Sequence, residues 1–383
     1  PAQDAFLVRK LKDAGAIILA KVNLHEFAVW GETVSSLGGQ TLNPYDLSRT
    51  PGGSSGGTGA GVAAGFGVAG IGTDTVNSVR SPASANSLVG IRPTTGLVSR
   101  SGLIPYSDSQ DTAGPIARCV SDAALLLDVM VGYDPEDART AYSVGQTGPG
   151  SYLAATVNPQ LAGRRIGLLR SLFGEGEESA QVNAAVEACI SAMRSLGVEF
   201  VELTENIDSA GLARDVSVHL HELERDLDSY LRRLGPEAPV HSLRDVLACG
   251  RFHPGIGDNL RQAIALDSEG LEYLRRLREQ EQLRRNLLKI MAQHKLDAFV
   301  FPHQQGLVVK IGQTQVGRNG VLASVVGFPS IAIPAGFSTP TTTAPLGVPI
   351  GIEFIGRPWS EYRLLEIAAA LEQARPVRVP PQL

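Results

Sequence analysis

The sequence predicts an α/β protein, because patterns typical of helices and of strands alternate along the chain. Short apolar runs of strand length recur between longer segments of helical periodicity. The composition is that of an ordinary globular protein, with 43% hydrophobic and 19% charged residues. A chain of 383 residues is also long enough to bury a large core.

The first part of the chain is predicted to begin with a helix over residues 4–14 that ends at Gly15. The apolar run at 16–20 predicts a short buried strand. Residues 31–58 are rich in Gly, Ser, Thr, Asn and Pro, which predicts an ordered but irregular loop. The next expected elements are a closely packed helix of small residues at 58–66, a strand at 67–72, a loop at 74–80 and an amphipathic helix at 121–131.

The rest of the chain continues this alternation. Residues 146–151 are the best candidate for a linker. The tract from 208 to 294 is predicted to be mostly helical. Around it, we expect strands at 163–169, 198–203, 296–301, 331–334 and 350–354, with helices at 180–195 and 360–374.

The charge balance narrows the class of function. The chain has 34 Lys and Arg against 39 Asp and Glu, and this net charge of −5 argues against proteins that bind nucleic acid or membrane surfaces. The three cysteines, Cys119, Cys189 and Cys249, lie far apart, so we expect no disulfide framework and no zinc site. His219 and His221 point to opposite faces of a predicted helix, and we therefore expect no metal.

The segment richest in chemistry is the glycine-rich stretch at 52–58. Its glycines let the backbone approach a ligand closely and expose N–H groups, and Ser54 and Ser55 add two hydroxyls. A plain flexible loop is the simplest alternative. Against it, the stretch lies between Pro51 and a tightly packed helix, and a helix–strand return could bring a second serine, Ser78, close to it.

Three other motifs match as strings but fail on their context. Residues 52–56 match the G-x-S-x-G nucleophile elbow, but no strand precedes them and nothing ties His294 or His303 to the loop. Residues 65–70 match the dinucleotide fingerprint, but they follow a helix and do not open one. A phosphate-binding P-loop would need lysine where Thr58 stands.

Taken together, several segments resemble the amidase signature family. The match is dense from about residue 10 to 135, moderate from 295 to 372 and weak between them. Its most specific parts are residues 51–57, residues 72–80 with Ser78 and Arg80, and residues 90–99. Supporting matches lie at 15–16, 21–27, 43–46, 327–337 and 356–358.

The resemblance implies a mixed twisted β-sheet covered by helices on both sides, and hydrolysis of amides by a Ser-Ser-Lys mechanism with an acyl-enzyme intermediate. By motif position Ser78 is the nucleophile and Ser54 the bridging serine, which passes the proton to a neutral lysine. The backbone N–H groups of Thr75, Val76, Asn77 and Ser78 are expected to form the oxyanion hole.

Five further residues are expected to shape the two loops. Asp74 and Arg80 flank Ser78, and we expect them to pair rather than to act in acid–base catalysis. Gly53, Ser55 and Gly56 are expected to shape the loop that carries Ser54.

Two departures from the family pattern bear on this site. The lysine-bearing segment of the family would fall before residue 1, and Lys21 matches a non-catalytic position, as if the N-terminal part were missing. Val76 and Asn77 stand where the family commonly has two glycines. Valine resists a left-handed backbone, so we expect an altered loop and a narrower pocket at that point.

We therefore expect a single amidase signature domain over 1–383, with 141–294 as a variable, mostly helical region around the substrate pocket. The expected reaction is hydrolysis of a linear C–N bond in an amide, or in a carbamate or urea-like group. The alternative is a non-catalytic or partner-dependent subunit resembling the A subunit of tRNA-dependent amidotransferases. We expect a small-molecule amide substrate, no cofactor, no nucleic acid, no membrane and a cytoplasmic location, and we leave a homodimer open.

Overall fold

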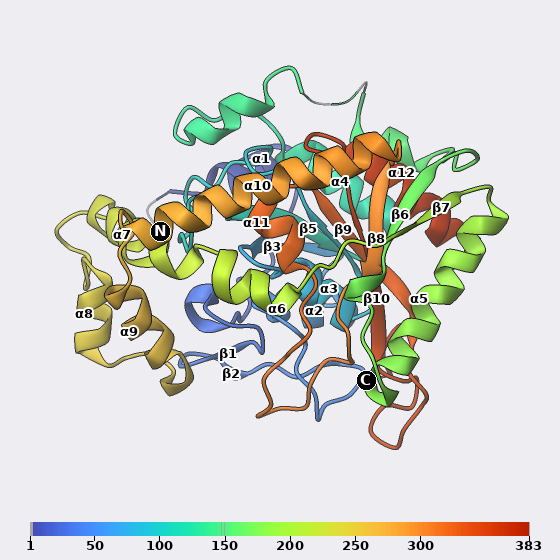
Figure 1. Cartoon of the computed structure of the whole chain (residues 1–383). Coiled ribbons are helices and arrows are strands. Elements are labelled where there is room, and N and C mark those ends of the chain that lie inside the picture. The colour runs from blue at the N-terminus through green and yellow to red at the C-terminus, as the bar shows by residue number, and fades with distance from the viewer. Residues whose placement is uncertain (1–2, 147, 149, 383) are drawn as a thin grey trace.

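The computed structural model describes residues 3–146, 148 and 150–382, and its centre is an eight-stranded mixed sheet (Figure 1). Across this sheet the first six strands are each antiparallel to their neighbours. The sixth of them, β8 (Ala298–Pro302), is also parallel to β6 (Arg165–Leu169), and β6 is parallel to β7 (Glu199–Leu203). A separate two-stranded sheet joins β1 (Val34–Ser35) to β2 (Gly39–Gln40). In spatial order the large sheet contains β3 (Ala69–Asp74), β5 (Thr112–Ala117), β4 (Val89–Arg92), β9 (Ser330–Phe337), β10 (Pro349–Ile355), β8 (Ala298–Pro302), β6 (Arg165–Leu169) and β7 (Glu199–Leu203).

Helices cover both faces of this sheet, which confirms the predicted α/β architecture. One face carries α1 (Phe6–Asp13), α4 (Val120–Met130), α5 (Glu177–Ser195) and α12 (Glu361–Ala374). The other carries α2 (Gly56–Ala63), α3 (Arg80–Ala85), α10 (Leu271–Gln293) and α11 (Val321–Val326). Single-turn segments lie at Glu26–Ala28, Ala138–Ser143, Tyr152–Thr156, Arg170–Leu172, Leu212–Val216 and Pro254–Ile256.

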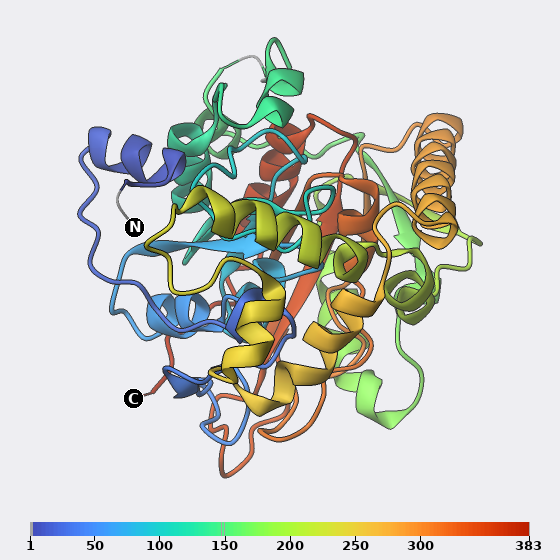
Figure 2. The same ribbon diagram turned by 90° about the vertical axis from the view of Figure 1, so that its left-hand side faces the viewer.

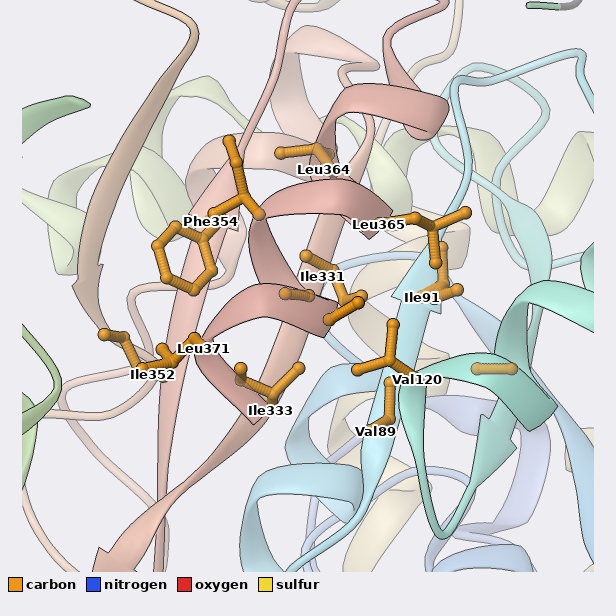
Figure 3. Close-up of a cluster of buried hydrophobic side chains, with 14 of the residues drawn as sticks. Val89, Ile91, Val120, Ile331, Ile333, Ile352, Phe354, Leu364, Leu365 and Leu371 are labelled. Carbon is orange, nitrogen blue, oxygen red and sulfur yellow. The ribbon is translucent and has the colours of Figure 1, made fainter. Parts of the chain in front are cut away.

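The two faces of the sheet differ because successive side chains of a strand point to opposite sides. Ile331 and Ile333 of β9, with Ile352 and Phe354 of β10, pack under α12 in the main core (Figure 3). Glu353 lies between the last two along β10 and faces the side of α3. The apolar face therefore stabilises the sheet, and the other face offers buried polar groups to a site.

A small lobe of helices lies at one end of the sheet. It contains α7 (His219–Arg233), α8 (Leu243–Cys249) and α9 (Gly257–Ala265), which pack around their own apolar cluster, and the short α6 (Ser209–Gly211) precedes it (Figures 1 and 2). The strand β3 also lies at this end, at the edge of the sheet opposite β7. The lobe and the end of β3 are therefore neighbours.

Most predicted elements are confirmed, but the strand at 16–20 is wrong. Ile17 and Leu19 are 84% and 70% exposed, and this run pairs with no strand among the described residues. Apolar content alone does not make a strand, because its backbone groups also need a neighbour. Two strands, β4 and β5, were not predicted. The linker candidate at 146–151 includes residues 147 and 149, which lie outside the described residues.

Across the described ranges, no helix combines the length and apolar character needed to cross a bilayer.

The contact between α12 and the start of α4 should make stability depend on pH. Glu372 of α12 accepts a hydrogen bond from the backbone N–H of Val120 (3.1 Å). Burial, helped by the nearby charge of Asp122, raises the pKa of Glu372 from 4.5 to about 7. Because the folded pKa is raised, this group's contribution to stability is fully present below the unfolded pKa and is lost as the pH rises through 7.

Replacing Glu372 with glutamine should remove this dependence. Between about pH 5 and pH 8, the free energy of unfolding of the wild type should fall by about 1–3 kcal/mol more than that of Glu372→Gln. Urea denaturation at both pH values measures this difference. The exposed Glu269→Gln, which removes the same charge from the surface, serves as the control. Parallel pH profiles for wild type and Glu372→Gln would contradict the assignment.

Candidate active site

A fully buried network of charges lies where β3 ends. Arg80, the first residue of α3, donates to both carboxylate oxygens of Asp74 (3.1 and 2.9 Å) and also pairs with Glu353 of β10. Arg92 of β4 donates to the same Asp74 (2.9 Å), and His303 contacts the second oxygen of Glu353 (2.6 Å). These side chains are inaccessible to solvent.

The network holds Asp74 and Arg80 in their charged forms. Burial alone would favour a neutral Asp74, but Arg80 and Arg92 hold the pKa of Asp74 well below its ordinary value. Burial likewise opposes the charge on Arg80, yet Asp74 and Glu353 raise the pKa of Arg80 above its ordinary value. The end of β3 is thus fixed by ion pairs that are closed to solvent, so water cannot take the place of either partner.

The loop Thr75–Ser78 crosses this network, and all four carbonyl groups that precede its N–H groups are held. The peptide bonds here are trans, so each carbonyl points away from the N–H that follows it. The carbonyl of Asp74 accepts from Arg92, that of Thr75 from Gln110 Nε2 (3.1 Å), that of Val76 from Ser324 Oγ (2.6 Å) and Arg80 Nη2 (2.9 Å), and that of Asn77 from the N–H of Ser81 (2.7 Å). Each N–H group of residues 75–78 is therefore turned away from the group that holds the carbonyl before it.

Val76 and Asn77 fit this loop without glycine. Neither has a positive φ, so the valine is not forced into a left-handed backbone. The Val76 side chain packs against the apolar cluster under α10 and α11. Asn77 is 2% exposed, and its Nδ2 has no hydrogen-bond partner among the described residues. The loop thus accommodates both side chains with ordinary backbone angles.

The glycine-rich loop packs directly against this segment. The N–H of Ser55 donates to the carbonyl of Ser78 (3.2 Å), which brings the two predicted serine segments together. On its other side, two glycines let the loop pack closely against Asn23 and Thr33. A Cβ at Gly56 would lie 2.2 Å from Thr33 Oγ1, and one at Gly57 would lie 2.2 Å from the carbonyl oxygen of Asn23. Side chains at either position would push the loop away.

The two adjacent serines have different surroundings. The hydroxyl of Ser55 is engaged by the backbone of Thr73, whose N–H lies 3.2 Å away. Ser54 follows Gly53 through a cis peptide bond, and its carbonyl accepts from the N–H of His25 (2.9 Å). Its Oγ is buried and has no partner among the described residues. Of the two hydroxyls, that of Ser55 is therefore engaged by the backbone and that of Ser54 is not.

Two lysines are engaged away from the serines, since the ammonium of Lys10 donates to the carbonyl of Val131 and Lys12 pairs with Asp4. Of the two histidines considered from the sequence, His294 caps the end of α10, whereas His303 belongs to the buried network and contacts Glu353. In the part of the chain that the structure describes, no cluster of His, Cys, Asp and Glu could hold a metal ion.

A cavity of about 1150 Å³ opens beside the loop. Thr73 and Thr75, from the end of β3, line one side. Residues of α7 and α10, including Glu222, Tyr230 and Tyr273, line the opposite side. A substrate of moderate size could reach the loop from here, between the sheet and the small helical lobe.

A family model described as Amidase matches residues 1–365. The chain belongs to the Amidase family. It is 33% identical over 402 residues to the A subunit of the glutamyl-tRNA(Gln) amidotransferase from Thermoanaerobacter pseudethanolicus, with 100% of this chain and 78% of that protein covered.

Two solved structures share the fold. The native peptide amidase from Stenotrophomonas maltophilia superposes with a TM-score of 0.86 at 36% identity, covering 99% of this chain and 78% of that one. The A subunit of the glutamyl-tRNA(Gln) amidotransferase from Thermotoga maritima gives 0.74 at 27% identity, covering 99% and 79%. The match to an amidase fold therefore extends over essentially the whole chain.

Several residues of this amidase site were not predicted from the sequence. Arg92 lies inside a recognised motif, but its contact with Asp74 depends on the pairing of β4 with β5. Glu353 lies far along the chain from Arg80 and meets it through the order of strands in the sheet. Gln110, which holds the Thr75 carbonyl, carried no signal in the sequence.

The buried network makes a sharp prediction for Arg80. In Arg80→Leu, two buried carboxylates lose their main cation, so the free energy of unfolding should fall by about 3–5 kcal/mol. Arg285→Leu is the matched control, because Arg285 pairs with Glu281 on the exposed side of α10 and should cost about 1 kcal/mol or less. Urea denaturation of both variants measures the difference. Equal losses would show that the buried pairs do not support the fold.

Proposed function

We propose that the protein hydrolyses a linear amide C–N bond, with Ser78 as nucleophile and Ser54 as proton relay. The observation that carries the proposal is the loop at 75–78. The carbonyls that precede its N–H groups are all held by neighbouring groups, which fixes the peptide units beside Ser78 and supports their use as an oxyanion hole. Membership of the Amidase family supports the same reaction.

In the first half of the reaction, Ser78 Oγ attacks the carbonyl carbon of the amide. Its proton passes to Ser54 Oγ, and the proton of Ser54 passes to a neutral lysine amine, the base that the family resemblance implies. The N–H groups of residues 75–78 stabilise the negative oxygen of the tetrahedral intermediate. The buried and unpartnered hydroxyl of Ser54 fits a group that must give and take a proton.

In the second half, the C–N bond breaks as the nitrogen takes a proton from Ser54, which regains one from the lysine. The amine leaves, and the acyl group stays on Ser78 as an ester. Water then attacks the acyl carbon and gives one proton to the lysine through Ser54. The bond from the acyl carbon to Ser78 Oγ breaks, Ser78 Oγ takes that proton back through Ser54, and the acid is released. A carbamate or urea-like bond would follow the same steps, since each offers a carbonyl carbon and a nitrogen leaving group.

For the substrate we propose a small amide that enters through the cavity of about 1150 Å³. The cavity carries charged groups of both signs, including Arg100, Asp108 and Arg225, which favours a polar substrate. The similarity to a peptide amidase supports this class. We propose a cytoplasmic location and leave the oligomeric state to measurement.

The similarity to amidotransferase subunits supports a second candidate, a subunit that works only with a partner. The structural superposition is closer for the peptide amidase than for the Thermotoga subunit, which favours an independent hydrolase. Turnover of simple amides by the purified protein alone separates the two. A partner-dependent subunit would show none until its partner is added.

The role of Ser78 can be tested with a covalent probe. A fluorophosphonate should label Ser78, and Ser78→Ala should abolish labelling and lower amide hydrolysis by about a thousandfold or more. Peptide mass spectrometry identifies the labelled residue. Ser81→Ala, which alters a nearby serine of α3, should still be labelled at Ser78. Labelling of Ser55 in an active sample would overturn the assignment.

The relay predicts different losses for two leaving groups. An amine must be protonated before it leaves, whereas an alcohol needs protonation less. Ser54→Ala should therefore slow the cleavage of an amide by at least about tenfold more than that of the ester with the same acyl group. Steady-state kinetics on the matched pair measure this ratio, with Ser55→Ala as the neighbouring control. Equal losses on both substrates would count against a relay through Ser54.

A further inference from the structure

Thr75 is held at both of its polar groups by one short segment. Its carbonyl accepts from Gln110 Nε2 (3.1 Å), and its hydroxyl donates to Asp111 Oδ1 (2.6 Å). The second oxygen of Asp111 accepts from the N–H groups of Tyr106 (2.7 Å) and Ser107 (2.9 Å). Two adjacent side chains therefore fix one residue of the loop by two different bonds.

This double contact has a direct geometric effect on the next peptide. The Thr75 carbonyl and the Val76 N–H belong to the same planar trans unit, so holding the carbonyl sets the direction of the N–H. The bond to Asp111 anchors the side chain of Thr75 and so holds its Cα in place. This limits rotation of the Thr75–Val76 peptide unit about that Cα. Of the carbonyls at 74–77, that of Thr75 is held by a side chain outside the charged network.

The same glutamine is tied to the helical lobe. Gln110 is 1% exposed, and its Oε1 accepts from the backbone N–H of Val218 (2.8 Å), from Ser217 Oγ (3.1 Å) and from Gln280 Nε2 (3.2 Å). Val218 directly precedes α7, and Gln280 belongs to α10. The side-chain amide thus spans the space between the oxyanion loop and the helices that line the cavity.

A second anchor supports the segment from α7. The buried carboxylate of Glu222 accepts from the N–H and hydroxyl of Ser109 (3.0 and 2.8 Å) and from the hydroxyl of Tyr273 (2.7 Å). It also contacts the hydroxyl of Ser107. The segment that carries Gln110 and Asp111 is therefore fixed to α7 and α10 independently of its contacts with Thr75.

From these contacts we propose that Gln110 and Asp111 are positioning residues for the oxyanion hole, which orient the Val76 N–H through Thr75 and tie it to the helical lobe. The inference rests on the proposed function of the loop. Gln110 is buried and is not among the residues that line the cavity, whereas Asp111 is one of them. Loss of Gln110 should therefore reduce the rate of the chemical step and leave substrate binding largely intact.

Gln110→Met keeps the length of the side chain and removes both its donor and its acceptor. In an active preparation it should lower kcat by about tenfold to a hundredfold, somewhat less than the loss of a whole oxyanion donor, with KM within about twofold of the wild type. Gln282→Met makes the same change on the exposed side of α10 and should leave both constants unchanged. An unchanged kcat, or a raised KM alone, would overturn the proposal.

A double-mutant cycle tests the link through Thr75. Thr75→Val and Asp111→Ala both remove the hydrogen bond between these side chains, and Asp111→Ala also removes its bonds to the N–H groups of Tyr106 and Ser107, so the double variant should lose little more kcat than Asp111→Ala alone. Thr75→Ser, which keeps the hydroxyl, should retain more activity than Thr75→Val. Additive losses in the cycle, or equal losses for Ser and Val, would show that Asp111 does not act through this hydroxyl.

Hydrogen exchange provides a readout that needs no turnover. If Gln110 orders the loop, the peptide covering residues 73–80 should exchange about tenfold faster in Gln110→Met, while thermal melting still shows a folded protein. Unchanged exchange would overturn the proposal even in an inactive sample. Absence of both turnover and Ser78 labelling in the wild type would instead contradict the proposed function, so the two failures are distinguishable.

Discussion

The site depends on the buried guanidinium of Arg80. It joins the end of β3 at Asp74, the Val76 carbonyl of the loop, Ser324 of α11 and Glu353 of β10. Arginine suits this position because its donors are fixed in a plane and it stays charged when buried. Each partner lies on a different element. The sheet, the helices α3 and α11 and the loop must therefore be in place together for these bonds to form. The geometry of the loop is therefore coupled to the packing of the whole sheet.

This coupling explains how the loop proposed as an oxyanion hole can form without glycine at its centre. Glycine would allow the backbone to turn its N–H groups freely, whereas here the turn is imposed by bonds to the carbonyls on the other side. Val76 and Asn77 adopt ordinary backbone angles, and the valine adds contacts to an apolar cluster. The side chains at these positions thus help to stabilise the loop, and the direction of its N–H groups comes from the buried network.

The sequence was sufficient for the class of fold and for the segments that carry the serines. Close contacts explain why glycine stands at positions 56 and 57. The spacing of Asp74 and Arg80 placed these two residues on either side of a loop. Long-range partners such as Glu353 could not be found this way, because they meet through the order of strands. The strands β4 and β5 were missed since glycine and proline interrupt both patterns. The strand predicted at 16–20 fails for the opposite reason. The run is apolar, but its backbone pairs with no strand among the described residues.

The helical lobe takes part in the site in two ways that use different atoms. Its side chains on α7, such as Tyr230 and Arg233, line the cavity, while the N–H of Val218 holds Gln110 behind the loop. A backbone donor is present whatever side chain the residue carries, unless it is proline. The cavity wall can therefore change in sequence without breaking that particular contact. Cavity side chains such as Tyr230 and Arg233 can thus change without loss of this contact, whereas Glu222 both lines the cavity and holds the segment behind the loop, so a change there would alter both.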